Sequence, residues 1–400
     1  MTTRQIAALE TRDVAVLGTT SIEKLLTTQL QALTAAQIGG LTSQQVFDLS
    51  TTTLKNLTTT QIAAIETTDL VVMSTDQLLS LSSSQVRALS TAQMVELTSV
   101  QLAGLSSAAV TALTTQQLSV LTDTERNYLD VASIAALGST QIAGLTTSQF
   151  AGLSTTAIAS LNTSTVSNLT TAQIAALTTD QALNLTTTTL KALTTKQIAV
   201  LETSDLEQLT SSNVAILSSV QLQALTTSQV AGLSSQQVFE MNTTTLQALT
   251  TRQIAALETR DVAVLGTSSI EMLLTTQLQA LTAAQIGGLT SQQVFDLSTT
   301  TLKNLTTTQI AAIETTDLMV MSTDQLLSLS STQVRALLTS QMVELTSVQL
   351  AGLSSAAVTA LTTQQLSVLT DTERNYLDVA SIAALGSSQI AGLTLSLIHI

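Results

Sequence analysis

Aliphatic residues recur along this chain with a period of eight. From Leu9 to Leu393, every eighth residue is Leu, Ile or Met. The block LTTTQIAA, residues 57–64, has the commonest order: an aliphatic residue, two hydroxyl residues, a free position, often Gln, a second aliphatic residue and two mostly small residues. We number these positions 1 to 8 within each octad. A repeat of this regularity predicts a repeat architecture.

The spacing excludes one continuous strand or helix. Positions 1 and 6 are separated alternately by five and three residues, whereas a strand needs even spacings. In a continuous helix, eight residues at about 100° each overshoot two turns by about 80°, so the apolar stripe would wind around the axis. Each octad is therefore predicted to interrupt its helix.

Positions 2 and 5 have the spacing of a helix N-cap. Thr58 can accept a hydrogen bond from the backbone N–H of Gln61, while the Gln61 side chain accepts one from the N–H of Thr58, which makes a capping box. Leu57 and Ile62 then stand at the two positions of a hydrophobic staple. This pattern predicts a helix of about six residues, from Thr59 to Ala64.

Helices this short are unstable alone, so they must stack on their neighbours. We predict an all-α solenoid, or superhelix, of about fifty very short helices over residues 1–394. Leu, Ile and Val should lie inside, with Thr, Ser and Gln outside or at the caps. A β-solenoid with bends inside each octad is the alternative.

A longer repeat lies above the octads. Residues 2–146 recur at 250–394 with seven differences, an offset of 248 residues. Residues 1–248 are thus one long unit and 249–394 a partial second copy. The blocks that begin at Thr186, Asn242 and Ser298 lie 56 residues apart, or seven octads. This shorter repeat reflects either duplication history or a structural period of seven octads.

The composition argues against catalysis. The chain has no Cys and one His, His399, and it lacks a phosphate-binding glycine loop and a GxSxG elbow. We therefore predict no enzyme and no catalytic, cofactor-binding or metal-binding residues. The net charge of −14, without a basic cluster, argues against nucleic acid and anionic membranes as partners. No apolar run approaches the roughly 18 residues that membrane insertion needs.

Five octads carry Glu at position 2 and Asp at position 5. Such a pair could form a cation or paired-carboxylate site, but only if the two groups converge on one point. We favour the simpler interpretation, in which the dipole of a helix N-terminus stabilises two acids by about 0.3–1 kcal/mol. The pairs are Glu10/Asp13, Glu66/Asp69, Glu202/Asp205, Glu258/Asp261 and Glu314/Asp317.

The main irregularity is residues 121–133, LTDTERNYLDVAS, where Arg126 occupies an aliphatic position. We predict a local repacking with Tyr128 as the core residue, rather than a binding site, and the same for the copy at Arg374 and Tyr376. Four phenylalanines are too sparse to stack nucleic-acid bases and are interpreted as core or edge fillers. They are Phe47, Phe150, Phe239 and Phe295.

The last six residues, 395–400 (LSLIHI), abandon the octad pattern. They resemble the translated start of a transposase-type sequencing adapter. We therefore expect a non-native tail in which His399 has no biological role. By the same interpretation the chain is a truncated gene product from an environmental assembly, and Met1 is an internal methionine.

From Met1 to Thr394 the chain resembles the Thr/Ser/Gln-rich octapeptide arrays, of the type LTTAQIAALTTAQ, of very large bacterial secreted or surface proteins. The resemblance implies a spacer, stalk or scaffold of an adhesin-like protein, located outside the cell or at its surface. It assigns no function to individual residues. The alternative is a module whose regular Thr and Ser rows bind a polysaccharide, ice or another ordered surface. Self-association stays open.

Overall fold

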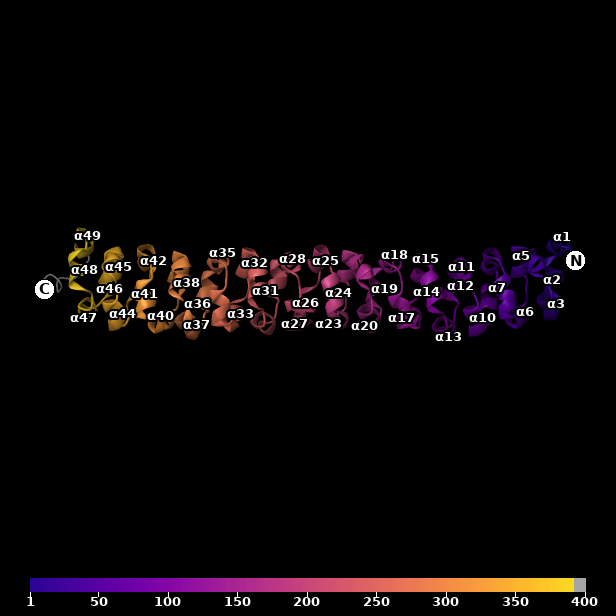
Figure 1. Ribbon diagram of the computed structural model, residues 1–400, viewed down its shortest axis with the longest axis horizontal. Helices are drawn as coiled ribbons and strands as arrows, with labels where there is room; N and C mark the ends of the chain where they lie inside the picture. The colour runs from indigo at the N-terminus through magenta and orange to yellow at the C-terminus, as the bar shows by residue number, and fades with distance from the viewer. Residues whose placement is uncertain (392–400) are drawn as a thin grey trace. The chain divides into compact units, whose positions relative to one another are not determined.

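The fold is an all-α solenoid, as predicted. The computed structural model describes residues 1–391, and these residues form 49 short helices and no strand (Figure 1). The alternative β-solenoid is therefore wrong. The tail at 395–400, with His399, lies outside the described residues.

The chain divides into two compact units, Met1–Gln208 and Leu209–Ile400. Each helix has four to six residues, and successive helices occupy successive octads. The helices of the first unit are α1 Thr3–Ala7, α2 Thr11–Ala15, α3 Thr19–Glu23, α4 Thr27–Leu30, α5 Ala35–Gly39, α6 Ser43–Asp48, α7 Thr51–Asn56, α8 Thr59–Ala63, α9 Thr67–Leu70, α10 Thr75–Leu79, α11 Ser83–Ala88, α12 Thr91–Val95, α13 Ser99–Ala103, α14 Ser107–Ala112, α15 Thr115–Val120, α16 Asp123–Asn127, α17 Val131–Ala135, α18 Ser139–Ala143, α19 Thr147–Ala151, α20 Thr155–Ala159, α21 Thr163–Ser167, α22 Thr171–Ala175, α23 Thr179–Leu183, α24 Thr187–Ala192, α25 Thr195–Ile198 and α26 Thr203–Gln208.

The second unit continues the same series of octads. Its helices are α27 Ser211–Ala215, α28 Ser219–Ala224, α29 Thr227–Ala231, α30 Ser235–Phe239, α31 Thr243–Ala248, α32 Thr251–Ala256, α33 Thr259–Val264, α34 Thr267–Glu271, α35 Thr275–Ala280, α36 Ala283–Gly287, α37 Ser291–Asp296, α38 Thr299–Asn304, α39 Thr307–Ala312, α40 Thr315–Val320, α41 Thr323–Leu327, α42 Ser331–Ala336, α43 Thr339–Met342, α44 Ser347–Ala351, α45 Ser355–Ala360, α46 Thr363–Val368, α47 Asp371–Arg374, α48 Val379–Ala383 and α49 Ser387–Ala391.

The reciprocal cap at Thr58 and Gln61 starts helix α8. Gln61 N donates to Thr58 Oγ1 at 3.3 Å, and Thr58 N donates to Gln61 Oε1 at 2.8 Å. The helix ends at Ala63, one residue earlier than predicted. Ile65 N still bonds to Ile62 O at 3.3 Å. Because no described residue has a positive φ, these helices do not end on a left-handed residue.

Most helices in each unit pack on helices three octads away. Helix α8 contacts α5 and α11. Helix α20 contacts α17 and α23, and these three helices lie along the lower edge of the first unit in Figure 1. Helices three octads apart thus belong to successive turns of the solenoid. Positions 1 and 6 fill the interior, where Leu57 is 5% and Ile62 0% exposed.

The glutamine at position 5 links successive turns, a role that the cap pattern does not predict. Gln61 Nε2 donates to Leu30 O at 2.9 Å and to Leu33 O at 2.8 Å, in the preceding turn. Gln61 lies at its cap, as predicted, but it is also buried, with an exposed fraction of only 2%. We call this arrangement, one cap bond through Oε1 and two cross-turn bonds through Nε2, the glutamine clamp. Further examples are Gln45, Gln93, Gln173, Gln285 and Gln333.

Candidate functional site

The two carboxylates of the Glu66/Asp69 pair have different surroundings. In the Glu66/Asp69 pair the Glu is exposed, whereas the Asp is 4% exposed and accepts a hydrogen bond from Ser43 Oγ at 2.6 Å. The described residues contain no group of three or more His, Cys, Asp or Glu side chains that could hold a metal ion. The Asp therefore acts in contacts between turns rather than in a shared site with its Glu.

Asp261 is the most enclosed of these acids, with 0% exposure. Its Oδ1 accepts from Ser235 Oγ at 2.8 Å, and its Oδ2 accepts from Glu258 N at 3.3 Å. Burial raises the pKa of Asp261 above its ordinary value, and the hydrogen bond from Ser235 partly opposes this. Arg260, which lies 2.8 Å from Glu258 and 3.6 Å from the Asp261 carboxylate, adds a smaller opposing effect.

The irregular octad at Leu121 keeps its register, so the prediction of Tyr128 as the core residue is wrong. Arg126 is 1% exposed and Tyr128 is 42% exposed. The Arg126 guanidinium donates to Leu121 O and pairs with Asp123, while its Nε has no hydrogen-bond partner. Burial lowers the pKa of Arg126, and the Asp123 carboxylate partly offsets that change.

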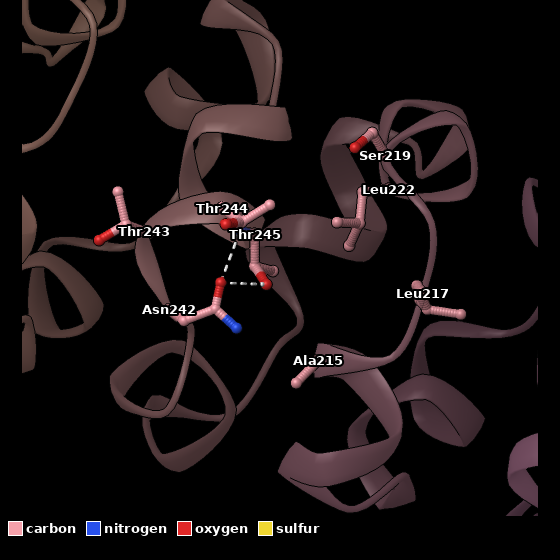
Figure 2. A pocket seen from close by; sticks show the side chains of 8 residues that line it. All are labelled: Ala215, Leu217, Ser219, Leu222, Asn242, Thr243, Thr244 and Thr245. Carbon is pink, nitrogen blue, oxygen red and sulfur yellow. Dashed lines mark hydrogen bonds between the residues drawn. The ribbon is translucent and has the colours of Figure 1, made fainter.

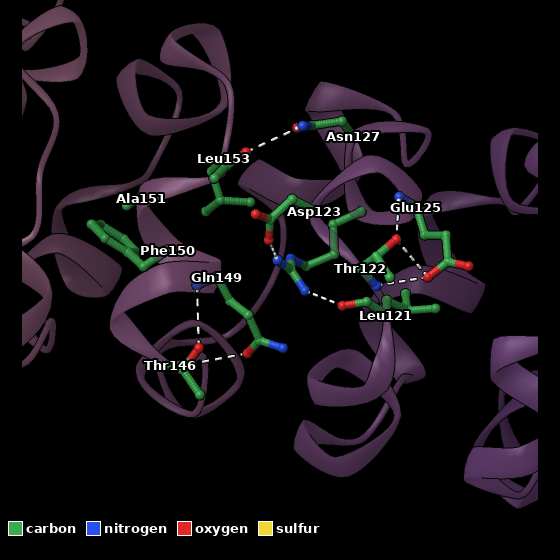
Figure 3. Close-up of polar contacts among 12 residues, drawn as sticks. Leu121, Thr122, Asp123, Glu125, Asn127, Thr146, Gln149, Phe150, Ala151 and Leu153 are labelled. Atoms are coloured by element: carbon green, nitrogen blue, oxygen red, sulfur yellow. Dashed lines mark hydrogen bonds and ion pairs between the residues drawn. The ribbon is translucent and has the colours of Figure 1, made fainter.

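The cap of this octad explains the register. Thr122 N donates to Glu125 Oε2 at 2.6 Å, and Glu125 N donates to Thr122 Oγ1 at 3.3 Å (Figure 3). This box fixes Arg126 at position 6, where the solenoid interior lies. The copy behaves alike, since Arg374 is 4% and Tyr376 42% exposed.

The phenylalanines divide between core and edge, as interpreted from the sequence. Phe150 is fully buried, whereas Phe47, Phe239 and Phe295 are 52–55% exposed. Two of the exposed rings line small surface depressions of the same composition. One consists of Ser43, Gln44, Phe47 and Val72, and the other of Ser235, Gln236, Phe239 and Val264.

A further pocket lies in the second unit, between α28 and the N-terminus of α31 (Figure 2). Asn242 caps α31 there, since its Oδ1 accepts from Thr245 N at 3.0 Å and from Thr245 Oγ1 at 3.2 Å. None of the residues that line it titrates near neutral pH. They are Ala215, Leu217, Ser219, Leu222, Asn242, Thr243, Thr244 and Thr245.

The hydroxyl residues are largely committed to the fold. A hydroxyl residue at position 2 caps its helix, as Thr58 does for α8. At position 3, the Thr115 methyl group packs where a Cβ of Gly144 would lie, at 2.8 Å from that point. The exposed position 4 has no constant chemistry. It is Arg4, Gln44, Asp76, Ala92 and Val100 in five of the octads.

Comparison with known families agrees with the repeat. The profile of the ALTTAQ repeat matches residues 6–43, 62–99, 198–235, 254–291 and 310–347. The chain is an array similar to the ALTTAQ repeat. Successive matches start 56 residues apart at 6 and 62, and again at 198, 254 and 310, which is the seven-octad spacing of the sequence. No curated protein matches the chain. None of the described helices has the length and apolar character to cross a bilayer.

Proposed function

We propose that this ALTTAQ-type array is a spacer, stalk or scaffold that holds other parts of a larger secreted or surface protein apart. The observation that carries the proposal is the glutamine clamp, which joins a turn to the preceding turn, as Gln61 does through Leu30 O and Leu33 O. A solenoid with nearest-neighbour contacts can gain or lose turns without a new core. Its length can then change while its local structure stays the same.

A bacterial, adhesin-like origin and an extracellular location belong to the same proposal. They rest on the resemblance to octapeptide arrays of large bacterial surface proteins. The net charge of −14 is also unsuited to a nucleic-acid partner. We propose no catalytic role, because neither the irregular octads nor the surface pockets bring together a nucleophile and a base.

The hydroxyl lattice is the weaker alternative. A lattice that binds ice or a polysaccharide needs free hydroxyl groups at regular intervals. Position 2 is used as a cap, position 3 packs between turns in octads such as that of Thr115, and position 4 varies between charged, polar and aliphatic residues. We expect no binding in ice-affinity or glycan-array assays.

Deleting whole octads tests the spacer proposal. A variant without residues 254–309 loses seven octads and keeps the octad phase. It should retain the helical circular dichroism per residue, and its maximum dimension in small-angle X-ray scattering should fall. A control without residues 254–305 breaks the octad phase and should lose folded structure. Unchanged dimensions in the first variant, or equal folding of both variants, would contradict the proposal.

A further inference from the structure

Four buried aspartates occupy the clamp position of glutamine. Each has an exposed fraction of 4% or less, and each accepts a hydrogen bond from a hydroxyl group 26 residues earlier. The pairs are Ser43/Asp69, Thr179/Asp205, Ser235/Asp261 and Ser291/Asp317.

An ionised aspartate cannot complete the clamp, because a carboxylate only accepts hydrogen bonds. In the neighbouring octad, Gln309 Nε2 donates to Leu278 O and Leu281 O at 2.8 Å. The same register sets Asp317 against the carbonyl groups of Ile286 and Leu289. No described side chain donates to the Leu289 oxygen.

One carboxylate oxygen of Asp317 also lacks a hydrogen-bond partner. Ser291 Oγ donates to Oδ1 at 2.6 Å, whereas Oδ2 is buried without a hydrogen-bond partner. The same is true of Asp205 Oδ2 in the first unit. A buried acceptor without a donor is costly, but a proton on Asp205 Oδ2 turns this oxygen into a donor.

We propose that Asp205 is an acid-operated clamp: it takes up a proton on Oδ2 and then donates to the carbonyl of Leu177 in the preceding turn. Acid therefore tightens this turn, and neutral pH loosens it. Only a proton moves, from solvent to the carboxylate. The first unit thus carries a pH-sensitive element, which goes beyond a passive spacer.

The charged groups around Asp205 are acidic and favour its protonation. They are Glu202, Glu207 and, on α23, Asp180.

Burial raises the pKa of Asp205, and the nearby Glu202 adds to this effect, whereas the hydrogen bond from Thr179 opposes it. The folded-state pKa then lies above the unfolded value of about 3.9. The stabilisation is therefore fully present below about pH 4 and is lost as the pH rises through the folded-state pKa.

The test compares thermal unfolding of the full chain and of an Asp205→Gln variant between pH 4 and 7.5. Glutamine donates at every pH, so the variant should unfold at a temperature higher by roughly 2–4 °C at pH 7.5 for each kcal/mol gained. This advantage should shrink toward pH 4. The exposed Asp324→Asn change removes a charge at position 4, outside the clamp, and should give a small difference that does not follow this trend.

Infrared spectroscopy gives a second readout that does not depend on stability. The full chain should keep a protonated-carboxyl absorption at a pH above the ordinary titration range of Asp, and this absorption should be weaker in the Asp205→Gln variant. An equal advantage of the variant at both pH values would overturn the proposal. So would stabilisation of the full chain at pH 7.5 by added Ca²⁺ or Na⁺ in place of acid, because a cation would then complete the clamp.

Discussion

Residues 73–104 and residues 121–136 have the same octad fold but differ in how their turns are joined. In the first region each of four successive octads has a complete glutamine clamp, made by Gln77, Gln85, Gln93 and Gln101. In the second region, the two octads carry Glu125 and Ser133 at that position. We call them the clamped region and the unclamped region.

The unclamped region keeps its helices but lacks the clamp bonds from position 5 to the carbonyl groups of the preceding turn. Glu125 caps its helix through Thr122 N and has no N–H to donate. Ser133 is shorter and bonds instead to Ser107 Oγ at 2.9 Å. No described side chain donates to the carbonyl oxygens of Leu97 and Leu105, which the clamp register would pair with these two positions. Capping and clamping are therefore separable functions of one position.

The largest expected effect comes from a charge without a partner in the clamped region. Leu102 and Arg126 both stand at position 6, three octads apart, and both are buried. Leu102→Asp should lower the free energy of unfolding by about 3–5 kcal/mol, because the carboxyl group has no cation to pair with. Chemical denaturation followed by circular dichroism measures this loss. A loss below about 1 kcal/mol would contradict the buried position.

Removing one clamp should have the next largest effect. Gln85→Ala removes the bonds to Leu54 O and Leu57 O, both of 2.8 Å, and leaves Leu57 O without this donor. We expect a loss of about 2–4 kcal/mol in the same denaturation experiment, since each buried unpaired polar group costs about 1–3 kcal/mol. The neighbouring exposed Ser84→Ala is the control and should change stability by less than about 0.5 kcal/mol.

Breaking the ion pair of the unclamped region should lower the free energy of unfolding somewhat less. Asp123→Ala leaves the buried Arg126 without its carboxylate and should cost about 2 kcal/mol, a value lowered by the 53% exposure of Asp123. Arg126→Leu restores an aliphatic residue and should be neutral or stabilising. If both single changes destabilise the chain equally, Arg126 does not need Asp123 as its partner.

The smallest expected effect is an increase in stability. Glu125→Gln keeps the cap on Thr122 and adds two N–H donors that can reach the preceding turn, at Leu97 O. We expect a gain of about 1 kcal/mol in the free energy of unfolding. The measurement is again denaturation at neutral pH. Glu96→Gln, a charge-matched change at position 8, should give no such gain.

The local structure of each octad could be predicted from the sequence because its determinants lie within eight residues. The Thr58 and Gln61 cap needs only a spacing of three and a side chain of the right length. The two clamp bonds could not be predicted in this way. They join Gln61 to residues 28 and 31 positions earlier, and that register depends on how many octads complete one turn.

The mistake at Tyr128 has a different origin. By polarity alone, a tyrosine is a better core residue than an arginine. Two local signals point the other way: the Thr122 and Glu125 box fixes the register, and Asp123, three residues before Arg126, supplies a carboxylate. In a repeat fold, the register set by the caps decides which residue is buried.

Hydrogen exchange of the unmodified chain tests the central claim most directly, because it compares the two regions within one molecule. If glutamine clamps hold successive turns together, backbone amides of residues 73–104 should exchange about tenfold more slowly than those of residues 121–136. Equal exchange, or faster exchange in residues 73–104, would contradict the claim that the clamps join the turns.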